Sequence, residues 1–312
     1  YNYIESEEGM PYIERLAAIC SNIGCGFKTN ELLKSHTTFK IGGICKCFID
    51  VNNAESLQKI LYFLKQENVS YFVMGRGSNI LASDEGYDGV ILHIGKLFSN
   101  IEIINDTDIR CTAGVALKDI CLFAMENSLT GLEFAYGIPG TCGGALYMNA
   151  GAYCGEIKDV VKSARYIDEK NSIRDIATNE MCLSYRHSIF SEYQNSIITD
   201  MIFSLKKGNK ENINAKMNEL MGRRRDKQPL EYPSAGSTFK RPEGSYASLL
   251  IDQCGLKGLS VGDAQVSLKH SGFIINKGNA SCRDVLELAE KVSKIVKNKT
   301  GYNLELEPVV LR

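Results

Sequence analysis

One segment of the chain is unusually rich in glycine, and it restricts the possible folds more than any other. Six glycines fall in residues 137–155, in Gly137-Ile138-Pro139-Gly140-Thr141-Cys142-Gly143-Gly144-Ala145 and in Asn149-Ala150-Gly151-Ala152-Tyr153-Cys154-Gly155. Glycine adopts positive φ and lets a backbone approach another group closely, but it loses much conformational entropy on folding. The loop therefore predicts a closely approached partner, and a bound cofactor would offset the lost entropy.

A second glycine loop follows a predicted β-α-β unit. Residues 48–51 and 71–74 read as strands, and the apolar spacing within residues 54–66 predicts an amphipathic helix between them. The unit ends in Gly75-Arg76-Gly77-Ser78-Asn79. Taken alone, this segment is more typical of a tight turn between strands than of a binding loop.

Neither loop fits the two common nucleotide-binding patterns. Ile80 stands at the third glycine position of G-x-G-x-x-G, and neither loop continues into the Lys-Ser or Lys-Thr of a P-loop. Both loops offer small residues that expose consecutive backbone N–H groups, which suit a pyrophosphate. The net charge of −1 agrees with local binding of an anion, and it argues against nucleic-acid or membrane partners.

Length and cysteine usage set the broad class. A chain of 312 residues with 44% hydrophobic content can form two or three lobes with cores of their own. No apolar run approaches the ~20 residues of a membrane span, and the start lacks the order of a signal peptide, so we expect a cytosolic protein. Eleven scattered cysteines without a C-x-x-C spacing predict buried free thiols, and no metal site is expected.

Further patterns divide the chain into three parts. We expect an N-terminal helical segment (1–35), a cofactor-binding part (36–206) that ends near the turn Lys206-Lys207-Gly208-Asn209, and a C-terminal part (207–312). The C-terminal part should contain a helix ended by Pro229 and a longer helix that starts with the capping box Ser281/Asp284. Residues 302–307 alternate with period two and predict a strand whose outer face carries Glu305 and Glu307.

A hydroxyl on a glycine hinge lies within a strongly cationic region. Ser237 follows Gly236 in Ala235-Gly236-Ser237-Thr238-Phe239-Lys240, between the run Arg223-Arg224-Arg225-Asp226-Lys227 and Arg241. This arrangement suits a polyanionic substrate that receives a proton. Simpler interpretations exist for these residues and for two other candidate segments. Ser237 would be a turn hydroxyl, the arginine run an exposed helix end, residues 185–188 a surface turn and Glu307 a solvated side chain.

Six motifs, in order, resemble the UDP-N-acetylenolpyruvoylglucosamine reductase family. They are Gly75-Arg76-Gly77-Ser78-Asn79, residues 137–153, Tyr185-Arg186-His187-Ser188, residues 235–240, Gly262-Asp263-Ala264-Gln265-Val266-Ser267 and Leu304-Glu305-Leu306-Glu307. The resemblance extends from about residue 37 to the C-terminus. The short interval between Arg186 and Ser237 is similar to the second, shorter type of this family, which lacks a substrate-capping loop.

The resemblance implies an α+β fold. Its parts would be an FAD-binding domain of the vanillyl-alcohol-oxidase (PCMH) type, in two lobes, and a smaller α+β substrate-binding domain. The implied reaction belongs to peptidoglycan synthesis: NADPH reduces non-covalently bound FAD, and flavin N5 passes a hydride to UDP-N-acetylglucosamine enolpyruvate, giving UDP-N-acetylmuramate. A monomer without nucleic-acid or membrane partners is expected.

The resemblance also assigns roles to residues. Ser237 matches the proton donor, and Arg186 and Glu307 match the pair that polarises the substrate carboxylate and stabilises the enol intermediate. Substrate contacts fall on Tyr185, Lys227, Arg241 and Gln265. Cofactor contacts fall on Gly75, Arg76, Gly77, Ser78, Asn79, Ile80, Pro139, Gly140, Thr141, Gly143, Gly144, Ala145, Asn149 and Gly151.

Two other functions fit parts of the same pattern. A flavin oxidase of this fold class would pass electrons to oxygen and would often hold FAD covalently through His or Cys, and no residue here clearly serves that purpose. A non-catalytic sugar-nucleotide sensor would keep the fold without the chemistry, but the joint presence of Arg186, Ser237 and Glu307 argues against it.

Overall fold

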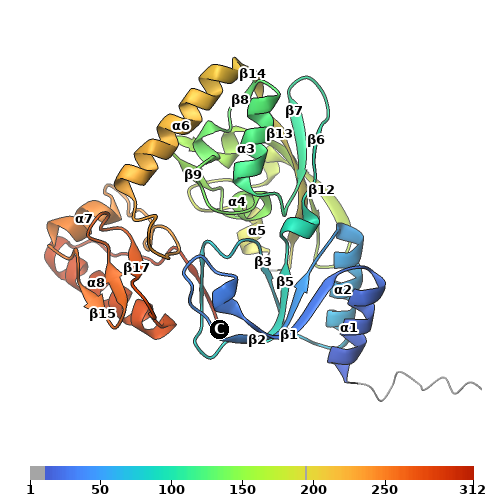
Figure 1. The fold of residues 1–312 in the computed structure, drawn as a ribbon, viewed down its shortest axis with the longest axis horizontal. Helices are drawn as coiled ribbons and strands as arrows, with labels where there is room; N and C mark the ends of the chain where they lie inside the picture. Colours follow the sequence, from blue (N-terminus) through green and yellow to red (C-terminus); the bar gives the residue numbers. More distant parts are fainter. Residues whose placement is uncertain (1–10, 194) are drawn as a thin grey trace, which may run out of the picture.

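The computed structural model describes residues 11–193 and 195–312. Its first sheet has the strand order β1-β2-β5-β3, formed by Gly26–Leu32, Ile44–Asp50, Tyr87–His93 and Tyr71–Met74. Strand β1 is antiparallel to β2, whereas β2, β5 and β3 are parallel. Helices α1 (Tyr12–Asn22) and α2 (Ala54–Gln66) lie together beside this sheet (Figure 1). The predicted β-α-β unit is confirmed, with β5 inserted between its two strands.

A second, fully antiparallel sheet forms the other lobe of this part of the molecule. Its order is β12-β11-β13-β7-β6, formed by Ile173–Ala177, Val161–Ile167, Ile197–Ser204, Asp108–Thr112 and Ile101–Ile103. Helix α4 (Cys142–Tyr147) packs against β13 and β7, and α3 (Leu117–Glu126) buries its apolar residues in the same core. One hydrophobic core runs through both lobes, from Leu16 to Met217.

The C-terminal domain is a small α+β unit. It contains the sheet β15-β16-β17 (Ser260–Val261, Ala264–Val266, Ile274–Asn276) and helices α7 (Ala247–Gln253) and α8 (Cys282–Thr300). The predicted capping box of α8 is present, and Gly301 ends the helix at a φ of 80°. The buried face of α8 packs into the domain's own core, as its hydrophobic spacing predicts.

Two segments connect the C-terminal domain to the rest. Helix α6 (Lys210–Lys227) starts on the first core, where Ile213 and Met217 are buried, and leads across to the C-terminal domain (Figure 1). The chain returns as β18 (Val309–Leu311), which pairs in parallel with β4 (Ile80–Ala82). Figure 1 accordingly shows the C-terminus beside β2. Smaller elements are β8 (Leu129–Thr130), β9 (Gly151–Ala152), β10 (Gly155–Glu156), α5 (Ile189–Glu192) and β14 (Lys206–Lys207).

The structure differs from the sequence analysis in three places. The strand predicted over residues 302–307 is wrong, because only Leu306 forms a bridge, to Phe239, and the pairing strand comes later as β18. The turn predicted at residues 206–209 begins with Lys206 and Lys207 paired to β8. Residues 1–35 include strand β1 as well as a helix, and residues 1–10 lie outside the described residues. The three-part division itself stays a prediction.

Burial of the thiols is largely as predicted. Nine cysteines are buried and Cys154 and Cys182 are exposed. Burial raises the pKa of the Cys20 thiol to about 12. Within the part of the chain that the structure describes, no helix is long and apolar enough to cross a membrane. No group of His, Cys, Asp and Glu side chains suited to a metal ion occurs among those same residues.

Candidate active site

The two glycine loops, far apart in sequence, meet in space. A Cβ atom at Gly75 would lie 2.4 Å from Thr141 Oγ1, and a Cβ atom at Gly140 would lie 3.4 Å from Ser78 Oγ. The first distance is shorter than real Cβ contacts, so only glycine allows this approach at residue 75. The loops therefore form one continuous surface between the two lobes, as a single cofactor site requires.

The first loop presents its backbone as the sequence analysis predicts. Gly77 has a φ of 64°, and a Cβ atom there would lie 2.2 Å from His36 O. Within the described residues, the N–H groups of residues 76–79 donate no hydrogen bond to another protein group. A row of free N–H groups on such a turn suits an anion, so this loop fits a dinucleotide pyrophosphate.

The second loop uses part of its backbone internally. The N–H groups of Cys142 and Gly143 donate to Val115 O (2.8 Å) and Ala113 O (2.9 Å). A Cβ atom at Gly143 would lie 2.7 Å from the Ala113 Cβ, so this glycine serves close packing. The Thr141 hydroxyl caps α4 by accepting from Gly144 N. The second loop therefore contributes close packing, and fewer of its backbone N–H groups are free to bind a ligand than in the first loop.

The side chain of Asn149, which is predicted to contact the cofactor, bonds within the protein. Its side chain is fully buried; Nδ2 donates to Ser184 O (2.8 Å) and Glu156 Oε2 (3.1 Å), and Oδ1 accepts from Lys158 N (2.9 Å). The side-chain amide is thus occupied by the protein itself. Because Ser184 directly precedes the Tyr185-Arg186 turn, Asn149 connects the second glycine loop to that turn.

Arg186 and Glu307 form an ion pair although 121 residues separate them. Arg186 Nε donates to Glu307 Oε1 at 2.7 Å, and the side chains are 20% and 8% exposed. Burial raises the pKa of the Glu307 carboxyl, and the nearby Arg186 charge works in the opposite direction. Arg186 also has a φ of 55°, which is uncommon for a non-glycine residue and is typical of functional turns.

The loop of Ser237 lies against the segment that carries Glu307. Thr238 O accepts from Glu307 N (3.0 Å), and Lys240 N donates to Glu305 O (2.9 Å). On its other side, Thr238 N donates to Gly272 O (2.8 Å). Gly236 provides the hinge with a φ of 77°, and the Ser237 side chain is half-buried. The structure therefore brings Ser237, Arg186 and Glu307 into one region.

An aromatic and cationic wall borders this region. The Tyr185 hydroxyl accepts from Arg241 N at 3.0 Å. The guanidinium carbons of Arg186 and Arg241 lie 5.2 and 4.9 Å from the centre of the Tyr185 ring, and Arg241 also lies over Tyr246. These are cation–π distances, and the wall suits an anionic group.

Arg224 is the residue of the arginine run that packs against a glycine loop. Arg223 pairs with the exposed Glu219 of its own helix. Arg224 packs on the second loop, since a Cβ atom at Gly137 would lie 3.1 Å from its Cδ. Burial lowers the pKa of Arg224. Lys227, at the end of α6, is exposed. The sequence alone leaves the choice among the three arginines open, because it does not reveal the helix orientation.

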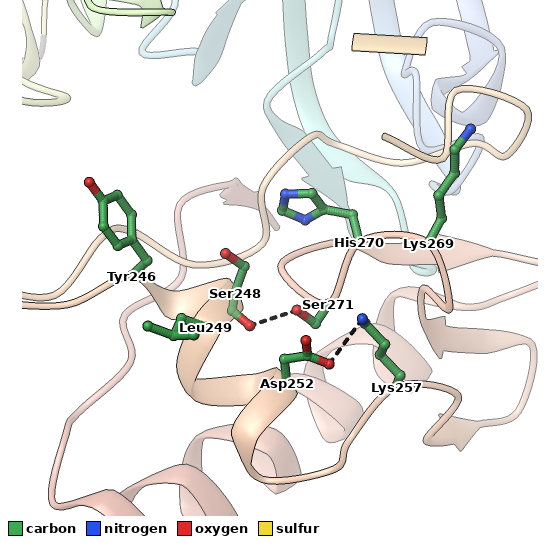
Figure 2. Close-up of a pocket in the computed structure, with 8 residues that line it drawn as sticks. All are labelled: Tyr246, Ser248, Leu249, Asp252, Lys257, Lys269, His270 and Ser271. Carbon is green, nitrogen blue, oxygen red and sulfur yellow. Dashed lines mark hydrogen bonds and ion pairs between the residues drawn. The ribbon is translucent and has the colours of Figure 1, made fainter. Parts of the chain in front are cut away.

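A pocket lies in the C-terminal domain (Figure 2). It has a volume of about 420 Å³ and is lined by Tyr246, Ser248, Leu249, Asp252, Lys257, Lys269, His270 and Ser271. Burial lowers the pKa of His270, whose ring meets Phe273 edge-on. No short sequence pattern marks this pocket, because its lining comes from α7 and its flanking residues and from the loop between β16 and β17. The side-chain amide of Gln265, which is predicted to contact substrate, donates to Gly258 O and Ser260 Oγ.

Comparisons with known proteins agree with this arrangement. Residues 45–177 match the family model of an FAD binding domain, and residues 228–311 match the C-terminal domain of UDP-N-acetylenolpyruvoylglucosamine reductase. The chain is 47% identical to the reductase of that name from Clostridium novyi, over 91% of each chain. It is 49% identical to the one from Caldanaerobacter subterraneus, over 88% of this chain and 90% of the relative.

A solved structure gives the same result for the fold. The UDP-N-acetylenolpyruvylglucosamine reductase from Thermus caldophilus superposes with a TM-score of 0.79 at 34% identity, over 92% of this chain and 99% of that one. The predicted fold is thereby confirmed: an FAD-binding domain of the vanillyl-alcohol-oxidase type, with a smaller α+β domain. The chain belongs to the UDP-N-acetylenolpyruvoylglucosamine reductase family, the FAD-containing oxidoreductases of peptidoglycan precursor synthesis.

Proposed function

We propose that this enzyme uses NADPH to reduce UDP-N-acetylglucosamine enolpyruvate to UDP-N-acetylmuramate, with Ser237 as the proton donor. The buried Arg186–Glu307 pair beside the Ser237 loop is the observation that carries the proposal. A buried ion pair is costly for stability alone, so its place at the meeting point of three loops favours a chemical role. The expected cytosolic location and monomeric state belong to the same proposal.

The loops at residues 75–80 and 139–145 would hold FAD. The free N–H groups of residues 76–79 fit its pyrophosphate, and Gly75 and Gly140 allow the two loops to close around it. When bound, FAD supplies the hydride for the enolpyruvyl group. Arg224 would place a positive charge next to the second loop.

Arg186 and Glu307 would act on the substrate carboxylate. Hydride addition leaves enolate-like charge on the carbon next to the reduced one, and a fixed guanidinium stabilises that charge. Glu307 holds the Arg186 guanidinium through the 2.7 Å hydrogen bond. Its raised pKa favours a shared or retained proton, which further lowers the negative charge facing the substrate.

Ser237 would then give its proton to the same carbon. The backbone bond from Glu307 N to Thr238 O supports this role, because it brings the loop of Ser237 next to the segment of Glu307. Tyr185, Arg241 and Lys227 would bind the diphosphate, and the pocket around Tyr246 and His270 would take the nucleoside end. A direct contact from Gln265 stays a prediction.

A substitution of the donor tests the chemistry. Ser237→Ala should leave flavin reduction by NADPH near normal and slow reoxidation of the reduced flavin by the UDP-sugar by roughly 10²-fold or more. Stopped-flow absorbance of the flavin follows both half-reactions. Ser245→Ala removes another half-buried hydroxyl from the same stretch of chain and should change neither rate.

Two results would contradict the proposal. Equal slowing of both half-reactions in Ser237→Ala would make the residue structural. Flavin that remains with the polypeptide after acid denaturation would indicate covalent attachment and would favour the oxidase alternative.

A further inference from the structure

We infer that Thr38 is a positioning residue that fixes the proton-donor loop relative to the cofactor loop. The inference rests on the proposed function, because it gives Thr38 a role in the step assigned to Ser237. Thr38 contacts both loops directly: its backbone N donates to Gly77 O at 3.2 Å, and its Oγ1 donates to Ser234 O at 2.8 Å. Ser234 lies three residues before Ser237.

These contacts belong to a closed circuit that is made of hydrogen bonds and of the short chain segments between them. From Ser234 the chain runs to Thr238, whose carbonyl accepts from Glu307 N at 3.0 Å. Glu307 O in turn accepts from Asn79 Nδ2 at 3.2 Å, and Asn79 lies in the same loop as Gly77. The circuit therefore joins the first glycine loop, the Ser237 loop and the Glu307 segment.

The segment that carries Thr38 is itself firmly held. Phe39 and Ile41 are buried in the core of the C-terminal domain, and Phe39 O accepts from Asn276 Nδ2 at 3.2 Å. The neighbouring Thr37 is 2% exposed, and its Oγ1 donates to Ile41 O at 3.0 Å within the segment. Thr38 therefore connects the first glycine loop and the Ser237 loop to a segment that its buried neighbours hold in place.

The Thr38 hydroxyl is the part of this support that reaches the donor loop. Without it, the start of that loop keeps a longer contact, from Gly236 N to Ser234 Oγ at 3.4 Å, and the bond from Asn276 N to Pro233 O at 2.9 Å. Gly236, with its positive φ, then lets Ser237 sample a wider range of positions. Proton transfer depends steeply on such placement, whereas reduction of the flavin by a nicotinamide does not involve Ser237.

The test compares three variants in both half-reactions. Thr38→Val removes the hydroxyl and keeps the backbone N–H and the shape; Thr38→Ser keeps the hydroxyl; Thr37→Val removes the neighbouring hydroxyl, which bonds only within its own segment. Thr38→Val should reoxidise with the UDP-sugar roughly 10-fold to 100-fold more slowly, with a larger solvent deuterium isotope effect. Its FAD affinity and its reduction by NADPH should stay within about twofold of the wild type.

Amide hydrogen exchange on the FAD-free protein gives a second measurement that does not depend on turnover. Thr38→Val should increase exchange in residues 234–239, while Thr38→Ser should resemble the wild type in exchange and in both rates. Thr37→Val is expected to lower thermal stability without changing the ratio of the two half-reactions or the isotope effect.

The outcomes separate this inference from the proposed function. Wild-type reduced enzyme that the UDP-sugar does not oxidise would refute the proposed function. If the wild type reacts and Thr38→Val matches it in reoxidation rate, isotope effect and exchange, the positioning role of Thr38 is refuted alone. Equal slowing of both half-reactions in Thr38→Val would likewise reduce Thr38 to a structural residue.

Discussion

Removal of the Arg186 charge should destabilise the protein in a pH-dependent way. Arg186→Met keeps an unbranched side-chain stem and the backbone strain at a φ of 55°, but it leaves the 8% exposed Glu307 carboxylate without its partner. Breaking a fully buried pair costs about 3–5 kcal/mol. Because Arg186 is 20% exposed and water reaches the site, we expect about 2–3 kcal/mol near pH 8.

The pH dependence has a definite sign. Burial already raises the pKa of Glu307, and loss of Arg186 removes the main opposing influence, so the pKa rises further. A carboxyl whose folded-state pKa lies above its unfolded value binds its proton more tightly when folded, so stability is lost as the pH rises through the folded-state pKa. The deficit of the variant should therefore be small near pH 5 and should grow by at most about 1.4 kcal/mol per pH unit above it.

Calorimetry of the FAD-free protein measures the effect, since bound ligand would mask it. For a chain of 312 residues, an unfolding entropy of about 2.1 cal/mol/K per residue converts 2–3 kcal/mol into a fall in Tm of roughly 3–5 °C. Arg165→Met, which breaks an exposed pair with Asp175, should cost less than about 1 kcal/mol at both pH values. The double variant Arg186→Met/Glu307→Gln should recover most of the lost stability. An equal Tm deficit at both pH values, or no recovery in the double variant, would refute the reasoning.

Three further predictions concern the loops, the second catalytic partner and the C-terminal domain. Gly77→Ala combines a φ of 64° with a Cβ atom 2.2 Å from His36 O, so it should destabilise the loop by more than ~1 kcal/mol and weaken FAD binding, measured by flavin fluorescence titration. Glu307→Gln should slow reoxidation of the flavin by the UDP-sugar but not its reduction by NADPH, and normal reoxidation would remove Glu307 from the site. Ser281→Ala removes the helix cap that accepts from Asp284 N at 3.0 Å and should cost about 1 kcal/mol in unfolding free energy; no change would mean that water replaces the cap.

Local patterns predicted the helices well because their signals are contained within the helices. Helix α2 occupies residues 54–66 as predicted, with its apolar residues buried on one face. Helix α8 begins after its capping box and ends at Gly301. Caps, glycine ends and a helical period are all short-range properties, so a single sequence contains them.

The period-two pattern at residues 302–307 shows that a local pattern does not determine which backbone groups form hydrogen bonds. Tyr302, Leu304 and Leu306 do pack on the core of the C-terminal domain, so the buried face was predicted correctly, but the Glu307 side chain is only 8% exposed and does not lie on an outer face. The hydrogen-bonding partners are loops, however, and a ladder does not form. Alternation reports which side chains are buried and not which backbone groups pair.

The Arg186–Glu307 pair could not be found from local sequence. Arg186 lies in a turn and Glu307 in an alternating segment, and either one read alone favours a solvated side chain. Their meeting depends on a contact across 121 residues, which only the complete fold determines. The resemblance to a known family supplied both residues, whereas Thr38 and the pocket at Tyr246 emerged only from the three-dimensional structure.

The return of the chain as β18 constrains how the C-terminal domain can move. The chain leaves the FAD-binding part through α6 and returns to it as β18, and Phe39 and Ile41 attach a further segment of that part to the core of the C-terminal domain. The returning segment also contacts the first glycine loop directly, because Val309 N donates to Asn79 O at 2.9 Å. A displacement of the C-terminal domain would therefore strain the loop that we propose to hold the FAD pyrophosphate, and we expect the position of the domain and the affinity for FAD to be coupled.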